Sequence, residues 1–307
     1  MSQLYHEYKR GNKVGYAKFE TFPVWNLPLK HPVNIAYEAS TADVKDINMI
    51  DSFHLEAYGK SAVNYNRDLS TFPILKDILH KITGTDIYKS PTDMGINMVK
   101  DCIINEDIVN EACSQEVIRR YYNAKCDFKK DLTDEETVDR IKLLMTELNI
   151  NEKNRDVIMP ALNKSKKEKT NAISLKLPNG KIITGKRTNL LTAASSLIIN
   201  AIKELNHIDD KVFLLSPAIL NPIMKLKENT FFDKSYNLNL QEVLIALSIC
   251  SVTNPIIEEA ISSLEQLKGC EAHASYMVSN GDLSILKRLR INLTCEPVFQ
   301  NDNILNS

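Results

Sequence analysis

The stretch Ala172-Ile-Ser-Leu-Lys-Leu-Pro-Asn-Gly-Lys-Ile-Ile-Thr184 decides the fold of the second half of the chain. Two short segments rich in apolar and β-branched residues, 172–177 and 181–184, lie on either side of Pro178-Asn179-Gly180. An Asn-Gly pair between two such segments favours a type I′ turn, because both residues tolerate positive φ. The stretch therefore predicts an antiparallel β-hairpin.

Downstream of this hairpin, segments with helical and strand-like patterns alternate. A helical spacing over 190–205 is followed by Val212-Phe-Leu-Leu215, an apolar run that predicts a buried strand. The same reasoning predicts helices over 217–227, 240–250, 255–267 and 282–288, and strands over 272–278 and 291–294. Helices that alternate with short apolar strands indicate a three-layer α/β domain. We place this C-terminal domain at residues 170–307.

The part of the chain before the hairpin is mostly helical from residue 105 onward. Thr133-Asp-Glu-Glu136 has the pattern of a capping box before a periodic apolar run, and a further helix is expected from Asn151. These features predict a small all-helical middle domain at 101–169. Its basic end, Lys164-Ser-Lys-Lys-Glu-Lys169, is interpreted as a solvated linker.

The first hundred residues combine both kinds of pattern. The expected elements are a helix over 4–8, a strand over 17–22, a helix over 32–40 and a helix from Asp68 or Ser70 to Ile82. They predict an N-terminal α/β remnant at residues 1–100. The predicted fold class of the whole chain is therefore α/β in the mixed, α+β sense.

Composition and charge exclude several classes of protein. The 307 residues carry a formal net charge of -1, whereas a general nucleic-acid binder usually has a basic face. There is no signal-peptide pattern and no apolar run of the roughly 20 residues that span a bilayer. The six scattered cysteines include no CxxC pair, which suits a reduced compartment. We therefore expect a cytoplasmic protein that binds neither nucleic acid nor membrane.

Chemically capable residues gather between Asp51 and Asn97, in short segments separated by Gly and Pro that we interpret as loops. The residues expected to bind a substrate here are Asn64, Asn66, Arg67, Asp68, Ser90, Thr92 and Gly95. Ser90-Pro-Thr-Asp-Met-Gly95 also fits a plain Asx or ST turn between two helices. Both interpretations stay open at this point.

Known zinc motifs do not account for this stretch. His54-Leu-Glu56 matches the H-x-E half of a zinc deaminase site, but the P-C-x-x-C half is absent from the chain. The H-E-x-x-H helix of a metalloprotease is absent as well. The sequence therefore supports neither class of enzyme.

Two further groups of residues lie in the C-terminal half. Thr184-Gly-Lys-Arg-Thr-Asn189 leads into a helix, so Lys186 and Ser195 are candidates for an anion cradle at the helix start, with a plain turn and capped helix as the alternative. Cys270, His273 and Cys295 are types that bind zinc, but no fourth ligand is evident. We predict no metal site, and His273 is expected to face a substrate.

Four motifs point to one family. Met49-Ile-Asp-Ser-Phe-His-Leu-Glu-Ala-Tyr-Gly59, Asn64-Tyr-Asn-Arg-Asp68, Ser90-Pro-Thr-Asp-Met-Gly95 and Leu293-Thr-Cys-Glu-Pro297 resemble the bacterial domain of unknown function family 1846. The resemblance runs from Ser2 to about Phe299 and carries no established activity. It implies a further upstream region in typical members, ending in a phosphate-loop-like Gly-Pro-Gly-Ser-Gly-Lys motif. On this resemblance the chain is expected to lack that region.

The leading hypothesis is the later part of a nucleotide-linked enzyme that uses ATP or another nucleotide with Mg²⁺. Lys60 and Arg67 would neutralise phosphate or carboxylate charge. His54 would act as acid or base, and Asp93 or Glu56 as base or Mg²⁺ ligand. The alternative is a non-enzymatic ligand-binding or oligomerisation module, which includes a homo-oligomer. Convergence of Lys60, Arg67 and Asp93 in one pocket would favour the enzyme.

Overall fold

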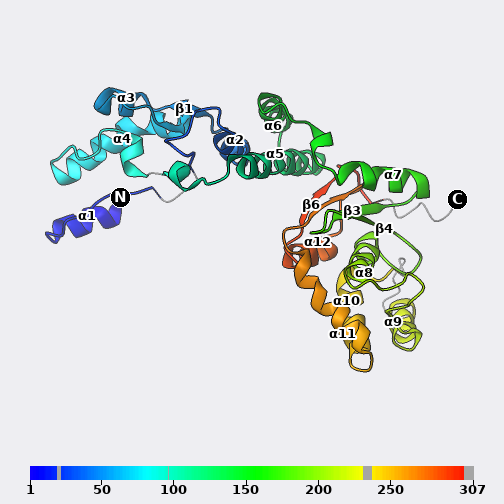
Figure 1. Ribbon diagram of the computed structural model, residues 1–307. Helices are drawn as coiled ribbons and strands as arrows, with labels where there is room; N and C mark the ends of the chain where they lie inside the picture. Colours follow the sequence, from blue (N-terminus) through cyan, green and yellow to red (C-terminus); the bar gives the residue numbers. More distant parts are fainter. Residues whose placement is uncertain (19–21, 96, 231–236, 301–307) are drawn as a thin grey trace. The chain divides into compact units, whose positions relative to one another are not determined.

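The computed structural model describes residues 1–18, 22–95, 97–230 and 237–300 (Figure 1). Helices and short strands occur together in it, which confirms the predicted mixed α/β fold class. The contacts divide the chain into two compact units. Unit 1 consists of Met1–Tyr121 and Thr133–Asn151, and unit 2 of Tyr122–Leu132 and Glu152–Ser307.

The hairpin of unit 2 is present, with β3 (Ala172–Lys176) antiparallel to β4 (Ile182–Lys186). Its predicted type I′ turn is wrong. The Leu177 N–H donates to the Lys181 carbonyl at 2.9 Å, so three residues form the loop, and only Gly180 among them has positive φ, at 84°. A type I′ turn needs positive φ at both central residues. Pro178 instead favours the first central position of a type I turn, with the glycine following in the left-handed region.

The hairpin is half of a four-stranded sheet in the order β4-β3-β5-β6. The strand β5 (Glu271–Ala274) is antiparallel to β3, and β6 (Asn292–Cys295) is parallel to β5. Parallel neighbours need a crossover connection, and α12 (Asn280–Arg288) provides it.

Helices cover both faces of this sheet, so the predicted three-layer arrangement holds (Figure 1). On one face α7 (Ile158–Glu168) contacts β3, β4 and β5, and the Ser174 hydroxyl donates to the Val157 carbonyl just before this helix. On the other face α8 (Ala193–Leu205) packs on β3 and β4, where Ile173 and Leu175 are fully buried.

The α8 helix approaches β4 closely at Gly185. A Cβ atom there would lie 2.7 Å from the Ala193 carbonyl oxygen and would overlap the Leu197 backbone nitrogen. Behind α8, a second core is formed with α9 (Pro217–Asn229), α10 (Leu240–Ser251) and α11 (Pro255–Ser262). The sequence therefore places glycine where the backbones of a strand and a helix meet.

The strand predicted over 212–215 is wrong, because these residues form turns and bends outside the sheet. Leu214 and Leu215 are buried, whereas Phe213 is 88% exposed. A short apolar run does not by itself distinguish a strand from a buried loop.

Unit 1 is built from shorter elements around a small core. They are α1 (Ser2–Lys9), α2 (Pro32–Ser40), η1 (Ala42–Val44), β1 (Asn48–Ile50), α3 (Ser52–Tyr58), β2 (Val63–Tyr65), α4 (Asn66–Thr83), η2 (Pro91–Met94), η3 (Val99–Cys102) and α6 (Glu135–Glu147). The strands β1 and β2 are antiparallel, and Phe72, Leu79 and Met94 form the buried centre of the apolar core around α4. The helix predicted from Asp68 or Ser70 to Ile82 is present as α4. The polar segment that begins at Asp51 was interpreted as a loop, but residues 52–58 form the α3 helix, which Asp51 caps.

The predicted middle helices are present but do not all lie in one unit. The long helix α5 (Glu106–Lys129) crosses from unit 1 to unit 2, α6 belongs to unit 1 and α7 to unit 2. A separate domain at 101–169 stays a prediction. The basic run 164–169 was expected to be a linker, but most of it lies within α7. The strand predicted over 17–22 falls largely on 19–21, outside the described residues. No helix in the described ranges has the length and apolar character needed to cross a membrane.

Replacing Gly185 with alanine should destabilise unit 2 by about 2 kcal/mol, because the added Cβ meets backbone atoms of α8 that cannot move independently. Gly281→Ala is the matched control, since a Cβ at that helical position meets nothing within 4 Å. It should be neutral or slightly stabilising. Urea unfolding followed by circular dichroism measures both. Equal stabilities for the two variants would contradict the close packing of α8 on β4.

Candidate functional site

Four of the predicted site residues meet in unit 1 where α3 packs against η2. We call this group, with the residues that hold it, the α3–η2 cluster. Its members are Asp51, His54, Tyr58, Ser90, Thr92 and Asp93. The cluster brings together residues separated by about forty positions in sequence.

Asp51 is fully buried and joins the two elements. As the N-cap of α3, its Oδ1 accepts the His54 N–H at 3.0 Å. Its Oδ2 accepts the Thr92 N–H at 3.2 Å and the Thr92 hydroxyl at 2.5 Å. A buried carboxylate needs such donors, because an unpaired buried charge costs several kcal/mol. Asp51 was not among the predicted site residues, although an Asp directly before a helical run signals an N-cap.

His54 is held by its Nδ1 atom, which lies 3.0 Å from the buried Ser90 hydroxyl and 3.9 Å from Asp93 Oδ1. Its ring packs edge-on against Trp25, with centroids 5.6 Å apart, and tilted against Tyr58 at 4.7 Å. No described residue provides a hydrogen-bond partner for its Nε2 atom. The imidazole is therefore fixed through one nitrogen while the other has no partner in the described part of the chain.

Asp93 is occupied by contacts within the cluster. Its Oδ2 accepts the backbone N–H groups of Lys89 and Ser90 at 2.8 and 3.0 Å, and the Tyr58 hydroxyl at 3.0 Å. The Ser90 hydroxyl in turn accepts the Asp93 N–H at 3.3 Å, which completes a capping box. The local turn predicted as the alternative for 90–95 is therefore present, and Asp93 helps to build it.

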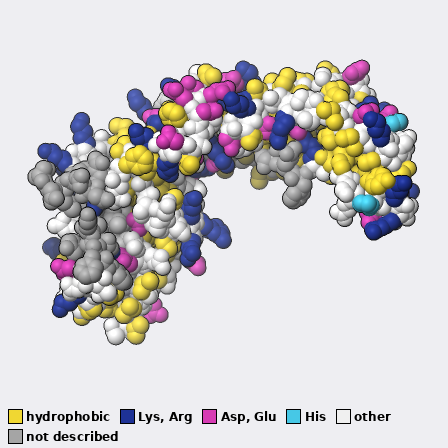
Figure 2. Space-filling view, turned by 180° about the vertical axis from the view of Figure 1, so that it is seen from behind, with side chains coloured by type: hydrophobic (Ala, Val, Ile, Leu, Met, Phe, Trp, Pro, Cys, Tyr) yellow, Lys and Arg dark blue, Asp and Glu magenta, His cyan; other side chains and the backbone are white. Residues whose placement is uncertain are grey.

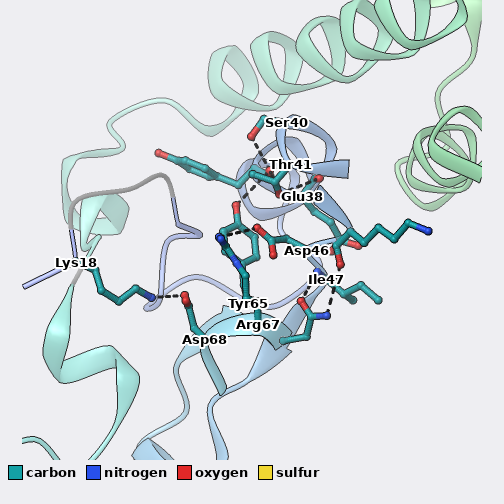
Figure 3. Close-up of polar contacts among 12 residues, drawn as sticks. Lys18, Glu38, Ser40, Thr41, Asp46, Ile47, Tyr65, Arg67 and Asp68 are labelled. Carbon is teal, nitrogen blue, oxygen red and sulfur yellow. Dashed lines mark hydrogen bonds and ion pairs between the residues drawn. The ribbon is translucent and has the colours of Figure 1, made fainter. Parts of the chain in front are cut away.

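A second polar group surrounds the start of α4 (Figure 3). The Arg67 guanidinium lies 3.1 Å from Asp46 Oδ2, and Lys18 forms an ion pair with Asp68 in which both side chains are more than nine-tenths buried. Asn66 Oδ1 accepts the Ile47 N–H at 2.9 Å. Burial raises the pKa of the Asp46 carboxyl, and Arg67 opposes part of that rise. These contacts fix the β1–β2 pair to α4.

Asn64 and Gly95 have structural surroundings as well. Asn64 is buried in β2, where its Oδ1 accepts the N–H of Tyr65. A Cβ at Gly95 would lie 3.2 Å from Lys18 Cβ, so the glycine permits close approach of the two segments. Neither residue lines the pocket formed by α1, the segment 14–16, α4 and the segment 85–88.

Lys60, Arg67 and Asp93 do not converge. Lys60 is exposed at the end of α3 and makes no hydrogen bond or ion pair with a described residue, and the same holds for Glu56. Arg67 contacts Asp46, and Asp93 contacts Tyr58. The described residues therefore do not form the pocket of Lys60, Arg67 and Asp93 that was expected to favour an enzyme.

The predicted anion cradle of unit 2 is filled by protein groups. Thr192 caps α8 by accepting the Ser195 N–H, and the Ser195 hydroxyl donates to the Leu238 carbonyl at 2.9 Å. Lys186 Nζ forms an ion pair with Glu168 Oε2 at 2.6 Å. The capped helix, the alternative given from the sequence, describes this segment.

His273 lies inside unit 2 and is fully buried. Its Nδ1 lies 2.8 Å from the Thr294 hydroxyl, and its Nε2 lies 3.3 Å from Glu296 Oε1. The buried Arg155 donates from Nε to the same Thr294 hydroxyl at 3.0 Å. Because a guanidinium only donates, Thr294 must accept from it, and the Thr294 hydroxyl can in turn donate to the Ala272 carbonyl at 3.2 Å or to His273 Nδ1. Burial lowers the pKa of His273, and the Glu296 carboxylate opposes only part of this.

The three zinc-type residues of unit 2 do not form a metal site. The Cys270 and Cys295 side chains belong to the apolar core that includes α8 and α12. The alternation of strand side chains puts His273 on the opposite face, against the Tyr122 ring of α5. Within the described ranges, no group of three or more His, Cys, Asp or Glu residues is arranged to hold a metal ion.

Comparison with known proteins identifies the family. The model "Domain of unknown function DUF1846, N-terminal" matches residues 1–149, and its C-terminal counterpart matches residues 153–305. The chain therefore belongs to the DUF1846 family. It is 52% identical over 313 residues to a UPF0371 protein of Clostridium botulinum (strain Alaska E43 / Type E3), and 49% identical over 316 residues to one of Clostridioides difficile (strain 630).

These matches cover nearly all of this chain but less of the relatives. They span 99% of the chain and 62% of the Clostridium botulinum protein, and 100% of the chain and 63% of the Clostridioides difficile protein. A UPF0371 protein of Clostridium tetani is matched over 62% of its length as well, at 49% identity. The chain thus spans about three-fifths of the length of these relatives.

The buried His273 should make unit 2 less stable in mild acid. Its pKa is lowered from 6.5 on folding, so below that value the unfolded chain binds more protons and the free energy of unfolding falls as the pH falls. His273→Asn should show a shallower loss of stability from about pH 7.5 to about pH 5. Thermal unfolding across this range measures the slope.

His207→Asn is the matched control, because His207 is exposed in the same unit and has a positive φ of 53°, which asparagine tolerates. This variant should keep the wild-type slope. Equal slopes for His273→Asn and wild type would show that His273 does not carry the pH dependence.

Proposed function

We propose that unit 1 is the substrate-binding and acid–base part of an enzyme that acts on a nucleotide or another phosphorylated small molecule. The observation that carries this proposal is the setting of His54, whose Nδ1 is held by Ser90 while no described residue occupies its Nε2. A histidine oriented through one nitrogen is suited to move a proton with the other. The Trp25 and Tyr58 rings restrict the imidazole further.

The charges near His54 suit a phosphorylated ligand. Lys60 is exposed just after the end of α3, and Lys89 Nζ lies 5.8 Å from the centre of the Tyr58 ring. Exposed ammonium groups can form charge-assisted hydrogen bonds to phosphate oxygens. Both lysines are therefore assigned to the ligand, whereas Arg67 is assigned to the scaffold because it contacts Asp46.

The two carboxylates proposed as base or Mg²⁺ ligand differ in availability. Asp93 Oδ2 accepts three hydrogen bonds within the cluster, whereas Glu56 is exposed and has no partner among the described residues. Mg²⁺ binds through one or two carboxylates and keeps several waters. We therefore assign this role to Glu56 and a positioning role to Asp93.

The relatives extend beyond the part they share with this chain, which leaves room for a phosphate-binding region outside it. We propose that such a region supplies a second wall of the site in those longer proteins. The α3–η2 cluster would then present His54 to the substrate.

Nucleotide titration with NMR detection of the histidine rings tests this proposal. Mg²⁺ with ATP or GTP should shift the His54 ring signals, assigned by their loss in His54→Gln, and leave those of the exposed His207 in place. Lys60→Ala should weaken binding several-fold, because it removes a charge-assisted contact. Lys13→Ala, an exposed change elsewhere in unit 1, should leave the affinity unchanged.

The full-length Clostridium tetani relative provides the decisive comparison by calorimetry with the same nucleotides. Binding there, tighter than to this chain, is the expected result. If neither protein binds either nucleotide, the proposal fails.

A non-enzymatic ligand-binding or oligomerisation module is the second candidate. Arg67 contacts Asp46, Asp93 contacts Tyr58, and Lys60 has no partner among the described residues. The three residues thus do not form one charged pocket, and this favours the module. A stable dimer in sedimentation velocity, combined with no nucleotide binding by either protein, would support the module over the enzyme.

A further inference from the structure

Unit 1 contains a pocket away from the α3–η2 cluster. Its walls come from α1, the segment 14–16, the C-terminal half of α4 and the segment 85–88. Apolar side chains of Leu4, Val14, Leu79 and Ile87 line it. Figure 2 shows hydrophobic side chains gathered on an outer face of unit 1 with charged side chains at their edge. None of the catalytic or substrate-binding residues predicted from the sequence lines this pocket.

Two oppositely charged groups line the same pocket. Lys76 of α4 is half-buried and makes no hydrogen bond or ion pair with a described residue. Asp86 Oδ1 accepts a hydrogen bond from His80 Nδ1 at 3.1 Å. The other carboxylate oxygen of Asp86 has no partner among the described residues. An ammonium without a partner beside apolar side chains is an attractive site for a carboxylate.

The Tyr88 hydroxyl is a further donor among the groups that line the pocket. Tyr88 accepts the Tyr16 N–H at 2.6 Å, and its hydroxyl hydrogen has no acceptor among the described residues. The pocket thus offers an ammonium and a hydroxyl for an anionic group, a carboxylate for a cationic group, and an apolar wall. Small-molecule sites combine groups of these kinds, but the enclosed space here is about 10 Å³, room for about one water molecule, so a ligand requires the pocket to open.

One wall of the pocket can move at little cost. The α1 helix buries none of its residues, and a hydrogen bond from the Tyr8 hydroxyl to the Thr83 carbonyl at 2.9 Å joins it to the end of α4. A helix with so little buried surface opens locally with a small free energy. A ligand larger than the present space can therefore be admitted by displacement of α1.

We propose that this pocket binds an amino acid with an aliphatic side chain, its carboxylate on Lys76, its ammonium near Asp86 and its side chain against Leu79 and Ile87. This site is independent of the nucleotide chemistry proposed for His54. Binding would also order α1 in its displaced position, because Leu4 would contact the ligand there.

Saturation-transfer NMR with three probes tests the proposal. L-leucine carries both charges, 4-methylpentanoate carries only the carboxylate, and isopentylamine carries only the ammonium. Leucine should bind at least tenfold more tightly than either single-charge probe. It should also slow hydrogen exchange of the α1 amides.

Variants identify the two charges. Lys76→Met should reduce leucine affinity to that of isopentylamine, and Asp86→Asn should reduce it to that of 4-methylpentanoate. Asp77→Asn is the matched control, because Asp77 lies on the same helix and pairs with Lys81 on the exposed surface. It should bind leucine as wild type does. Equal binding of all three probes, or no saturable binding of leucine by the folded wild-type protein, would overturn the proposal.

Discussion

The carboxylate of Asp51 is the interaction on which the organisation of the proposed site depends. It is fully buried and accepts hydrogen bonds from α3 and from η2. The apolar core around α4 is small, so polar contacts must help to fix these short elements. If Asp51 loses its donors, α3 and η2 separate, and with them His54 and Ser90. The proposed chemistry of His54 therefore rests on a contact made three residues before it.

Both units use buried polar networks to hold a histidine, but in different ways. In unit 2 the chain from Arg155 through Thr294 to His273 is enclosed, and the histidine is fully buried. In unit 1 His54 is fixed by Ser90 on one side, and its other nitrogen has no described partner. His273 has no exposed surface, which suits a structural role, because such an imidazole cannot reach a substrate. His54 is buried as well but keeps 8% of its surface exposed, and its Nε2 has no partner among the described residues.

The sequence predicted the architecture of unit 2 better than its details. The hairpin, the alternation of helices and strands and the three layers follow from local apolar patterns and are confirmed. The predicted turn type was wrong because Pro178 favours the first central position of a type I turn, whereas the prediction considered only Asn179-Gly180. The strand at 212–215 was wrong because an apolar run does not reveal whether a sheet edge is available. Pairing partners distant in sequence are not visible in a local pattern.

For the candidate site, the sequence located the region but not the roles. His54, Ser90, Thr92 and Asp93 do come together, although Ser90, Thr92 and Asp93 bond mainly within the protein. Residue type alone does not tell whether a polar group will face a ligand or another part of the chain. Asp51 was missed for the same reason, because its second partner, Thr92, lies 41 residues away in sequence.

Nitrogen-15 NMR of the His54 imidazole in wild type and in Asp51→Asn tests the central claim most directly. Asparagine keeps one acceptor oxygen where aspartate has two, so it cannot accept from both the His54 N–H and the Thr92 groups. One of the two links is lost, and this should loosen η2 and Ser90 from α3. One dominant His54 tautomer is expected in the wild type, and populations close to those of free histidine are expected in the variant. Identical His54 spectra for the two proteins would contradict it.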